Sequence, residues 1–366
     1  MPTVLKSVDS GRVRQSQCQL YMPQKSTYLV TGGAGFIGSH LIDLLLAESQ
    51  TGEVRILDNF SSGRREHLAH HGADARLKIY QLDLLDLEKA LPHFVGVDQV
   101  FHLAANPDAR WGIANTRLDL EQETLVTYNV LEAMRRHSVA QIILSSSGTV
   151  YGDVGTTVTH EKLGPCLPIS LYGAGKVAAE ALITAFCGTF GMRTVILRFG
   201  NIVGERTTHG AIYDFIKQLV KNSAELKVLG NGHQAKPYVY VRDLVGALRF
   251  AGEKCSGLAD GKFEVFNVAP DDATSVRFMA EDLVRQLGFA GRTKIIYGTS
   301  AIGWPGDVAQ SRMDASKIRQ AGYSWPRNSD AAVRISISRT IEWLAKHAEP
   351  DAELRLPADA RPAIPK

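Results

Sequence analysis

The most constraining feature of the sequence is a glycine-rich turn between an apolar run and an amphipathic helical pattern. Residues 28–38 read Tyr-Leu-Val-Thr-Gly-Gly-Ala-Gly-Phe-Ile-Gly, and Gly33, Gly35 and Gly38 give the spacing G-x-G-x-x-G. The first four residues predict a buried strand, and apolar residues recur with helical period from Phe36 onward. Glycines let a pyrophosphate approach the backbone, and a helix N-terminus offers free N–H groups. The pattern therefore predicts a dinucleotide-binding turn.

An acidic residue after the next apolar run supports this prediction. Asp58 ends the run Val54–Asp58 and follows the third glycine of the motif at the expected distance. A carboxylate there accepts hydrogen bonds from the ribose hydroxyls of an adenosine and repels a 2′-phosphate, so it favours NAD over NADP. Arg64 and Arg65 follow closely and could hold a 2′-phosphate, which leaves NADP as an alternative.

Strand-like and helical runs alternate along most of the chain, which predicts an α/β fold with a doubly wound, Rossmann-type parallel sheet. Two of the helical patterns cover Leu125–Arg136 and Val177–Phe190. We divide the chain into an N-terminal extension (1–26), the NAD-binding domain (27–200), a smaller substrate-binding lobe interleaved with returning sheet strands (201–348) and a disordered tail (349–366). The predicted strands are Tyr28–Thr31, Val54–Asp58, Leu77–Leu82, Gln99–Leu103, Gln141–Ser145, Thr194–Arg198 and Glu264–Val268.

Composition excludes several classes of function. The net charge of the 366 residues is +3 without a basic stripe, which argues against a nucleic-acid partner. No run of apolar residues is long enough to span a membrane, and the polar N-terminus lacks the apolar core of a signal peptide, so we expect a cytoplasmic protein. His67, His70 and His71 are interpreted as a solvated stretch rather than a metal site. The cysteines lack C-x-x-C spacing and predict free thiols: Cys18, Cys166, Cys187 and Cys255.

A tyrosine and a lysine four residues apart are the candidate catalytic pair. Tyr172 and Lys176 share one face of a predicted helix, so the ammonium would stabilise a phenolate. That effect would lower the pKa of the tyrosine from about 10 toward neutrality and make it a general base. Ser147 follows a predicted strand and would hydrogen-bond the reacting hydroxyl, whereas Ser145 and Ser146 fit better a turn that satisfies its own backbone.

With these motifs the sequence resembles the extended short-chain dehydrogenase/reductase family, in particular the nucleotide-sugar epimerase/dehydratase group and its UDP-glucose 4-epimerase-like enzymes. The resemblance runs from about Tyr28 to Leu344. Its further markers are Leu57-Asp-Asn-Phe-Ser-Ser-Gly63, Asp83-Leu-Leu-Asp86, His102-Leu-Ala-Ala105, Ser145-Ser-Ser-Gly-Thr-Val-Tyr-Gly152, Arg198-Phe-Gly-Asn201 and Pro237-Tyr-Val-Tyr-Val-Arg-Asp-Leu244.

The resemblance implies a role for individual residues. Tyr172, Lys176 and Ser147 would be catalytic. Residues that would bind NAD are Gly32, Gly35, Phe36, Ile37, Asp58, Asn59, Ser61, Gly63, Asp83, Leu84, Leu103, Ala104, Ala105, Ser145, Tyr172, Lys176 and Phe199. Residues that would bind a nucleotide-diphosphate sugar, with UDP as the expected nucleotide, are Ser147, Asn201, Val228, Leu229, Lys236, Asp307 and Ser311.

The implied activity is an isomerase that inverts a sugar hydroxyl, at carbon 4 of a UDP-hexose or UDP-N-acetylhexosamine, through a transient 4-keto sugar. Alternatives are a dehydrogenase, reductase or dehydratase of the same family, and a non-catalytic regulator that binds NAD or a sugar. The family usually pairs as a homodimer through two helices, for which Leu125–Arg136 and Val177–Phe190 are candidates.

Four positions depart from the family pattern. Gly148 and Thr149 replace the acidic pair of the dehydratases, which argues against 4,6-dehydration. Trp304 stands where many hexose epimerases have a phosphate-binding arginine, and Lys236 or Arg312 would have to compensate. Ser311 matches a gate position where a small residue leaves room for an N-acetyl group. Glu123 replaces a common asparagine, and the sequence offers no account of this change.

Overall fold

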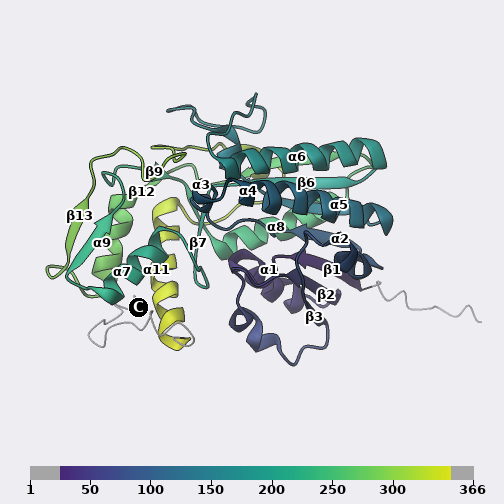
Figure 1. Cartoon of the computed structure of the whole chain (residues 1–366), viewed down its shortest axis with the longest axis horizontal. Coiled ribbons are helices and arrows are strands. Elements are labelled where there is room, and N and C mark those ends of the chain that lie inside the picture. Colours follow the sequence, from purple (N-terminus) through teal and green to yellow (C-terminus); the bar gives the residue numbers. More distant parts are fainter. Residues whose placement is uncertain (1–24, 348–366) are drawn as a thin grey trace, which may run out of the picture.

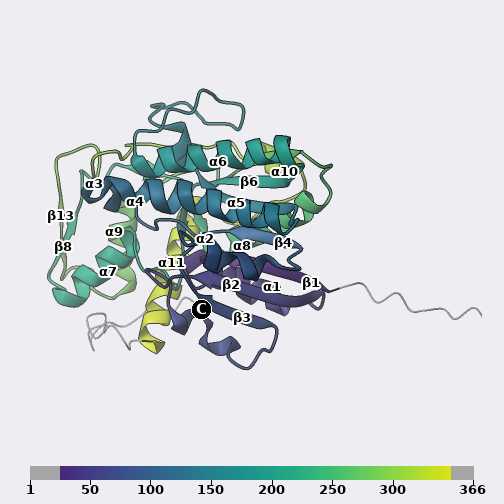
Figure 2. The ribbon, with the colours of Figure 1, turned by 45° about the vertical axis from the view of Figure 1, so that its right-hand side comes forward.

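A computed structural model describes residues 25–347 of the chain. Its centre is a seven-stranded parallel sheet with the order β11-β6-β5-β4-β1-β2-β3 (Figures 1 and 2). The proposed tail, and the proposed extension up to residue 24, lie outside the described residues. The sheet strands are β1 (Ser26–Thr31), β2 (Thr51–Asp58), β3 (Leu77–Gln81), β4 (Gln99–His102), β5 (Gln141–Ser147), β6 (Arg193–Phe199) and β11 (Phe263–Val268).

All seven predicted strands are present and all join this one sheet, so the predicted doubly wound fold is confirmed. The strand order reverses direction at β1, whose neighbours are β2 on one side and β4 on the other. In open parallel sheets ligands bind beyond the carboxyl ends of the strands at such a switch point. The glycine-rich turn follows β1 and therefore lies at that point.

Helices cover both faces of the sheet because alternate side chains of each strand point in opposite directions. Val30 and Ile143 pack with α1 and α8 on one face, and Leu29 and Ile142 pack with α5 and α6 on the other. The main helices are α1 (Phe36–Ala47), α2 (Leu87–Ala90), α3 (Trp111–Ala114), α4 (Thr116–Asp119), α5 (Val126–Arg136), α6 (Leu171–Phe190), α7 (Ala211–Lys221), α8 (Val241–Ser256), α9 (Val276–Gln286), α10 (Ser316–Gln320) and α11 (Ser329–Lys346).

Helix α6 begins at Leu171, so Tyr172 and Lys176 lie on a helix as predicted, and the helical pattern at Val177–Phe190 covers the rest of it. The hydroxyl of Ser170 accepts the backbone N–H of Gly173 at 3.1 Å and caps the helix. Gly191 ends it with φ +74°, a conformation that favours glycine. The longer helix places Tyr172 and Lys176 in its first two turns.

A second apolar core lies beside the sheet, at the left of Figure 1. It joins α7, α9 and α11, with Phe215, Met279 and Ile337 among its buried side chains. The interleaving with the sheet is visible in the chain order, since β11 returns to the sheet after α7 and α8. The exact domain boundaries remain a prediction. The short strands are β7 (Asn201–Val203), β8 (Glu225–Val228), β9 (Ala235–Lys236), β10 (Tyr238–Tyr240), β12 (Thr274–Ser275) and β13 (Lys294–Tyr297).

The described residues also contain four short segments of other helix types: the 3-10 helices η1 (Arg65–His71), η2 (Leu91–Phe94) and η4 (Gly148–Tyr151), and the π-helical η3 (Leu120–Leu125). Within residues 25–347 no helix is both long enough and apolar enough to cross a membrane.

Replacing Ile143 with alanine is expected to lower the free energy of unfolding by about 2–5 kcal/mol, because its side chain is fully buried in β5, an interior strand of the sheet, and its loss leaves a cavity. Ile113→Ala is the matched control, since Ile113 is 52% exposed, and its effect should stay within about 0.5 kcal/mol. Urea unfolding followed by circular dichroism measures both variants. Equal effects would contradict the placement of Ile143 in the core.

Candidate active site

The turn after β1 is built on two close backbone approaches. Gly32 has φ +67°, and a Cβ atom there would lie 2.8 Å from the backbone nitrogen of Ala104. A Cβ atom on Gly38 would lie 2.3 Å from the carbonyl oxygen of Gly32. Only glycine allows α1 to begin this close to the ends of β1 and β4. No side chain caps α1 at Gly35, so its first backbone N–H groups remain available to an anion.

Asp58 closes the other side of the turn. Its Oδ2 accepts the N–H of Ala34 at 2.9 Å, and its Oδ1 accepts the N–H of Phe60 at 2.8 Å. Burial raises the pKa of this carboxyl group, and the two backbone donors partly offset that effect. The carboxylate is thus fixed at the end of β2, at the position predicted for the adenosine ribose.

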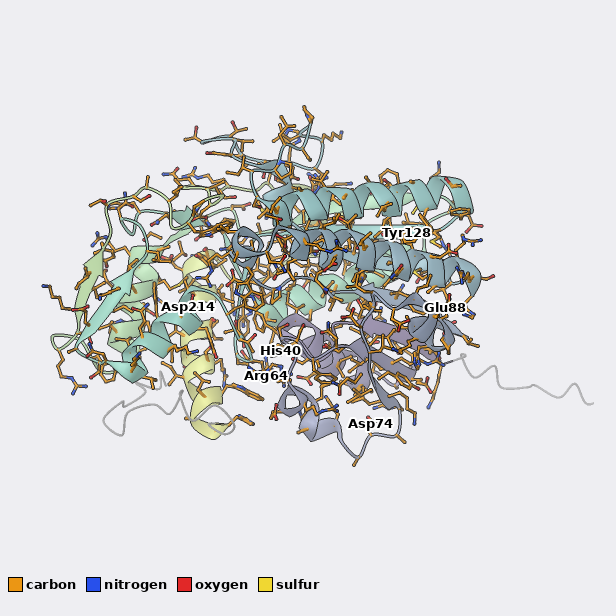
Figure 3. The ribbon with its side chains drawn as sticks, viewed as in Figure 1. His40, Arg64, Asp74, Glu88, Tyr128 and Asp214 are labelled. Carbon is orange, nitrogen blue, oxygen red and sulfur yellow. The ribbon has the colours of Figure 1, made fainter. Side chains whose placement is uncertain are left out.

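Arg64 and Arg65, for which NADP was given as an alternative cofactor, follow Asp58 in the sequence. Nη2 of Arg65 donates to Oε1 of Gln81 at 2.6 Å, and its guanidinium stacks 4.5 Å above the ring of Phe60. Arg65 is therefore engaged by the protein in this conformation. Arg64 is labelled in Figure 3, below His40 of α1.

One cavity of about 930 Å³ extends from this turn to the second core. Its volume lies in the range of ligand-binding pockets. Predicted residues that line it are Gly32, Gly35, Phe36, Ile37, Asp58, Asn59, Ser61, Asp83, Leu84, Leu103, Ala104, Ala105, Ser145, Ser147, Tyr172, Lys176, Phe199, Asn201, Leu229, Lys236 and Asp307.

Three predicted site residues do not line this cavity. Gly63 packs behind Asp58, since a Cβ atom on it would lie 2.9 Å from Oδ1 of Asp58. Val228, the last residue of β8, is buried in the second core, and Leu229, which follows the strand, lines the cavity. Ser311 lies alongside β9, where its N–H donates to the carbonyl of Ala235 at 3.1 Å.

The catalytic candidates meet at the cavity wall. Nζ of Lys176 lies 5.5 Å from the centre of the Tyr172 ring and donates to the carbonyl oxygen of Ser145 at 3.0 Å. Burial is the largest effect on the pKa of Tyr172 and raises it, and the nearby carboxylates of Glu123 and Asp119 raise it further. The ammonium of Lys176 and a hydrogen bond with Ser147 lower this pKa. Together these effects raise the pKa of Tyr172, so the predicted fall of this pKa toward neutrality does not occur in the protein without a bound cofactor.

The three serines at the end of β5 have different hydrogen-bond partners. The hydroxyl of Ser145 donates to the carbonyl of His102 at 3.0 Å, and the hydroxyl of Ser146 donates to Glu180. Ser147 accepts the N–H of Thr149 at 3.2 Å and faces the cavity. Ser145 and Ser146 are thus internally satisfied, while Ser147 is the serine beside Tyr172.

A buried acidic group that the motifs did not predict lies next to Lys176. Oε2 of Glu123 lies 2.7 Å from Nζ of Lys176, and Asp119 accepts a hydrogen bond from Nδ2 of Asn106 at 2.8 Å. The departure from asparagine at position 123 was the available signal. The role of a glutamate at this position depends on which side chain it contacts in the fold, and the linear sequence does not show that contact.

Charged side chains also line the cavity beside α7. The guanidinium of Arg110 donates to Asp108 and, at 3.0 Å, to Asp214 of α7, which Figure 3 labels in the left half of the molecule. Nδ1 of His209 is buried without a hydrogen-bond partner in the described structure. Arg110 thus ties the loop after β4 to the lobe, and its charge is balanced by two carboxylates.

Elsewhere in the cavity wall, Lys236 forms an ion pair with Asp307, and Trp304 also lines the cavity. The carboxylate of Asp307 therefore already balances the positive charge of Lys236. Arg312 is exposed and lies outside the cavity lining, so the structure does not support it as a substitute for the missing arginine.

Comparison with known proteins identifies the family. Residues 28–269 match the NAD dependent epimerase/dehydratase family. The chain belongs to this family.

A Methanocaldococcus jannaschii protein provisionally named UDP-glucose 4-epimerase is 31% identical over 86% of this chain and 97% of its own length. UDP-glucuronic acid decarboxylase 1 of Danio rerio is 32% identical over 60% of this chain and 52% of its own length. A crystal structure of UDP-galactose 4-epimerase superposes with a TM-score of 0.76 at 36% identity and covers 88% of this chain and 99% of its own.

The cofactor of the family is NAD, and the residues present fit it. The backbone cradle at Gly32 and Gly38 would be filled by any Cβ atom, the N–H groups of α1 suit a pyrophosphate, and Asp58 suits ribose hydroxyls. The predicted cofactor is thus confirmed, whereas the contacts of individual residues remain proposals.

The prediction of a solvated histidine stretch was wrong for His67, whereas His70 is exposed as predicted. His67 is buried, its Nδ1 lies 3.0 Å from the carbonyl oxygen of Ala34, and burial lowers its pKa to about 4. His70 and His71 each place Nε2 2.8 Å from Oδ1 of Asp43 on α1. Arg206 occupies the other oxygen of that carboxylate at 2.8 Å, so the three ligand atoms belong to a hydrogen-bonded hub. The described cysteines, Cys166, Cys187 and Cys255, are free thiols as predicted.

Asp58→Asn is expected to weaken NAD binding and to reduce discrimination against NADP, because the side chain keeps its shape but loses the charge that repels a 2′-phosphate. The ratio of the two dissociation constants should fall about tenfold, equivalent to about 1.4 kcal/mol. Isothermal titration of protein stripped of cofactor measures it, with Asp83→Asn as the control for a nearby carboxylate. An unchanged ratio in Asp58→Asn would contradict this role.

Proposed function

We propose that this chain is an NAD-dependent nucleotide-sugar 4-epimerase that acts on a UDP-hexose or UDP-N-acetylhexosamine. The observation that carries the proposal is the convergence of Tyr172, Ser147 and Lys176 on the same cavity as the dinucleotide turn. Fold alone does not decide among the activities of the family, so the argument rests on this site.

Each catalytic side chain has a task in the proposed reaction. The phenol oxygen of Tyr172 takes the proton of the sugar hydroxyl and later returns it, while Ser147 orients that hydroxyl. Lys176 stabilises the phenolate, an effect that is stronger inside the protein than in water. NAD, when bound, supplies the hydride acceptor and donor, and its oxidised ring adds positive charge. The raised pKa of Tyr172 fits a phenol that ionises only in the assembled complex.

Dehydration is disfavoured by packing as well as by residue type. A Cβ atom on Gly148 would lie 2.8 Å from Sδ of Met313 and 3.3 Å from the carbonyl of Phe199. A carboxylic acid at that position would therefore require rearrangement. Thr149 lines the cavity but carries no acid. These observations support inversion over elimination of water.

The substrate would extend from Tyr172 toward the second core. We assign its diphosphate and nucleoside to the walls at Asn201, Leu229, Lys236 and Asp307, which all line that end of the cavity. Val228 and Ser311 are not assigned as direct contacts of the substrate, because neither residue lines the cavity.

Tyr172→Phe is expected to lower kcat by about 10²- to 10⁴-fold, because phenylalanine keeps the ring but has no oxygen to carry the proton. NAD affinity should change little. The assay incubates protein with UDP-glucose, UDP-galactose and their N-acetyl forms, reads product stereochemistry by NMR, and follows NADH absorbance.

The controls separate the alternatives. Conversion without a net change in NADH supports an epimerase, whereas stoichiometric formation of NADH indicates a dehydrogenase and stoichiometric consumption of added NADH indicates a reductase. Binding without any conversion by the wild-type protein would indicate a regulator. Full activity of Tyr172→Phe would overturn the mechanism. Tyr128→Phe, on the outer part of α5, removes a phenol oxygen elsewhere and should leave turnover unchanged.

We also propose a homodimer through α5 and α6. Tyr128 of α5 and Phe190 of α6 are 44% and 51% exposed, and Phe186 lies between them, with ring centres 6.5 Å and 5.1 Å away. The two helices pack side by side (Figure 2), so these rings can form one apolar surface.

Light scattering should give a mass about twice the 39.9 kDa of the chain, and Tyr128→Glu should give the single-chain mass, because a buried unpaired carboxylate opposes association. Phe263→Glu is the control, since this exposed aromatic lies at the start of the edge strand β11. A monomeric wild-type protein would refute the proposal.

A further inference from the structure

The carboxylate of Glu123 is held entirely by protein groups beside the catalytic lysine. Oε2 lies 2.7 Å from Nζ of Lys176, and the two side chains are 1% and 3% exposed. Oε1 accepts the backbone N–H of Asn106 at 2.9 Å. A buried ion pair this close forms only where other groups satisfy the remaining hydrogen bonds, and Asn106 meets that need.

The backbone is shaped to bring this carboxylate in. Glu123 belongs to η3, a π-helical segment between α4 and α5, and such widened turns recur at functional sites. A Cβ atom on Gly175 would lie 2.6 Å from Cβ of Glu123. The glycine in α6 therefore permits the close approach of η3, and any larger residue would push Glu123 away from Lys176.

The ion pair also directs the lysine. An ammonium has three N–H donors, and two of them reach Glu123 and the carbonyl oxygen of Ser145 at 3.0 Å. Lys176 itself lines the cavity. The remaining donor is therefore left for a group in the cavity, on the side of Tyr172.

We propose that Glu123 is a positioning residue for Lys176, a built-in counter-ion that fixes the ammonium and sets the charge around Tyr172 during catalysis. This inference rests on the proposed function, because it assigns Lys176 and Tyr172 their catalytic tasks.

Other charged groups around the ammonium do not duplicate this role. His102 of β4 stays neutral, since burial and Lys176 lower its pKa to about 3. Glu180 of α6 is paired with Arg198 at 2.6 Å. Asp119 of α4 has Oδ2 without a partner in the described structure and packs against Gly112. Glu123 is the carboxylate in direct contact with the ammonium.

Removing one negative charge acts on both partners in the same direction. A nearby carboxylate raises the pKa of the Tyr172 phenol and of the Lys176 ammonium. The reactive form needs an ionised phenol and a protonated amine, so the first group sets the acid limb of the pH–rate profile and the second sets the alkaline limb. Glu123→Gln should move both limbs to lower pH.

The experiment compares pH profiles of kcat for the NAD-loaded wild-type protein and Glu123→Gln. We expect both limbs to shift by about one pH unit. Glu123→Asp keeps the charge and should restore both limbs toward wild-type values. Glu132→Gln of α5 is the matched control, because this buried carboxylate pairs with Arg135 and Arg136 and should leave the profile unchanged.

A fall in kcat without movement of either limb would overturn the inference and indicate a purely structural role. If Glu123→Gln does not fold, Gly175→Ala displaces Glu123 from Lys176 and should also move both limbs to lower pH, and an unshifted profile there overturns the inference equally. The proposed function is judged separately. An active Tyr172→Phe defeats both, whereas an inactive Tyr172→Phe with an unshifted Glu123→Gln defeats this inference alone.

Discussion

The contact between the start of α1 and the end of β1 governs the rest of the structure. A Cβ atom at Gly38 would lie 2.3 Å from the carbonyl of Gly32, and one at Gly32 would strike the backbone after β4. Without those atoms the helix N-terminus reaches the switch point of the sheet, where its N–H groups open onto the cavity. Asp58 then closes the turn by accepting the N–H of Ala34.

The catalytic end of the cavity depends on buried charge rather than apolar packing. Lys176 is kept protonated inside the protein because Glu123 offsets the cost of its burial. Burial and, after it, the same carboxylate raise the pKa of Tyr172, which favours the protonated phenol. In the proposed function, the positive charge of the oxidised cofactor would then favour ionisation of this phenol.

Charged pairs also join the sheet to the second core around the cavity. Arg110, after β4, reaches Asp214 of α7, and Arg206 reaches Asp43 of α1. His70 and His71 share that carboxylate, so α1, η1 and the segment after β7 meet at one hub. These contacts hold the lobe in place beside the dinucleotide turn.

The sequence by itself determined the seven strands, the parallel sheet, the dinucleotide turn and the pair Tyr172 and Lys176, because these follow from local periodicity and from motifs within a few residues. Only the tertiary structure decided that Glu123 pairs with Lys176, that His67 is buried, and that Leu229 rather than Val228 faces the cavity. These facts depend on which side chains from distant segments meet. Their electrostatic effects arise from burial and distance, which a linear pattern does not record.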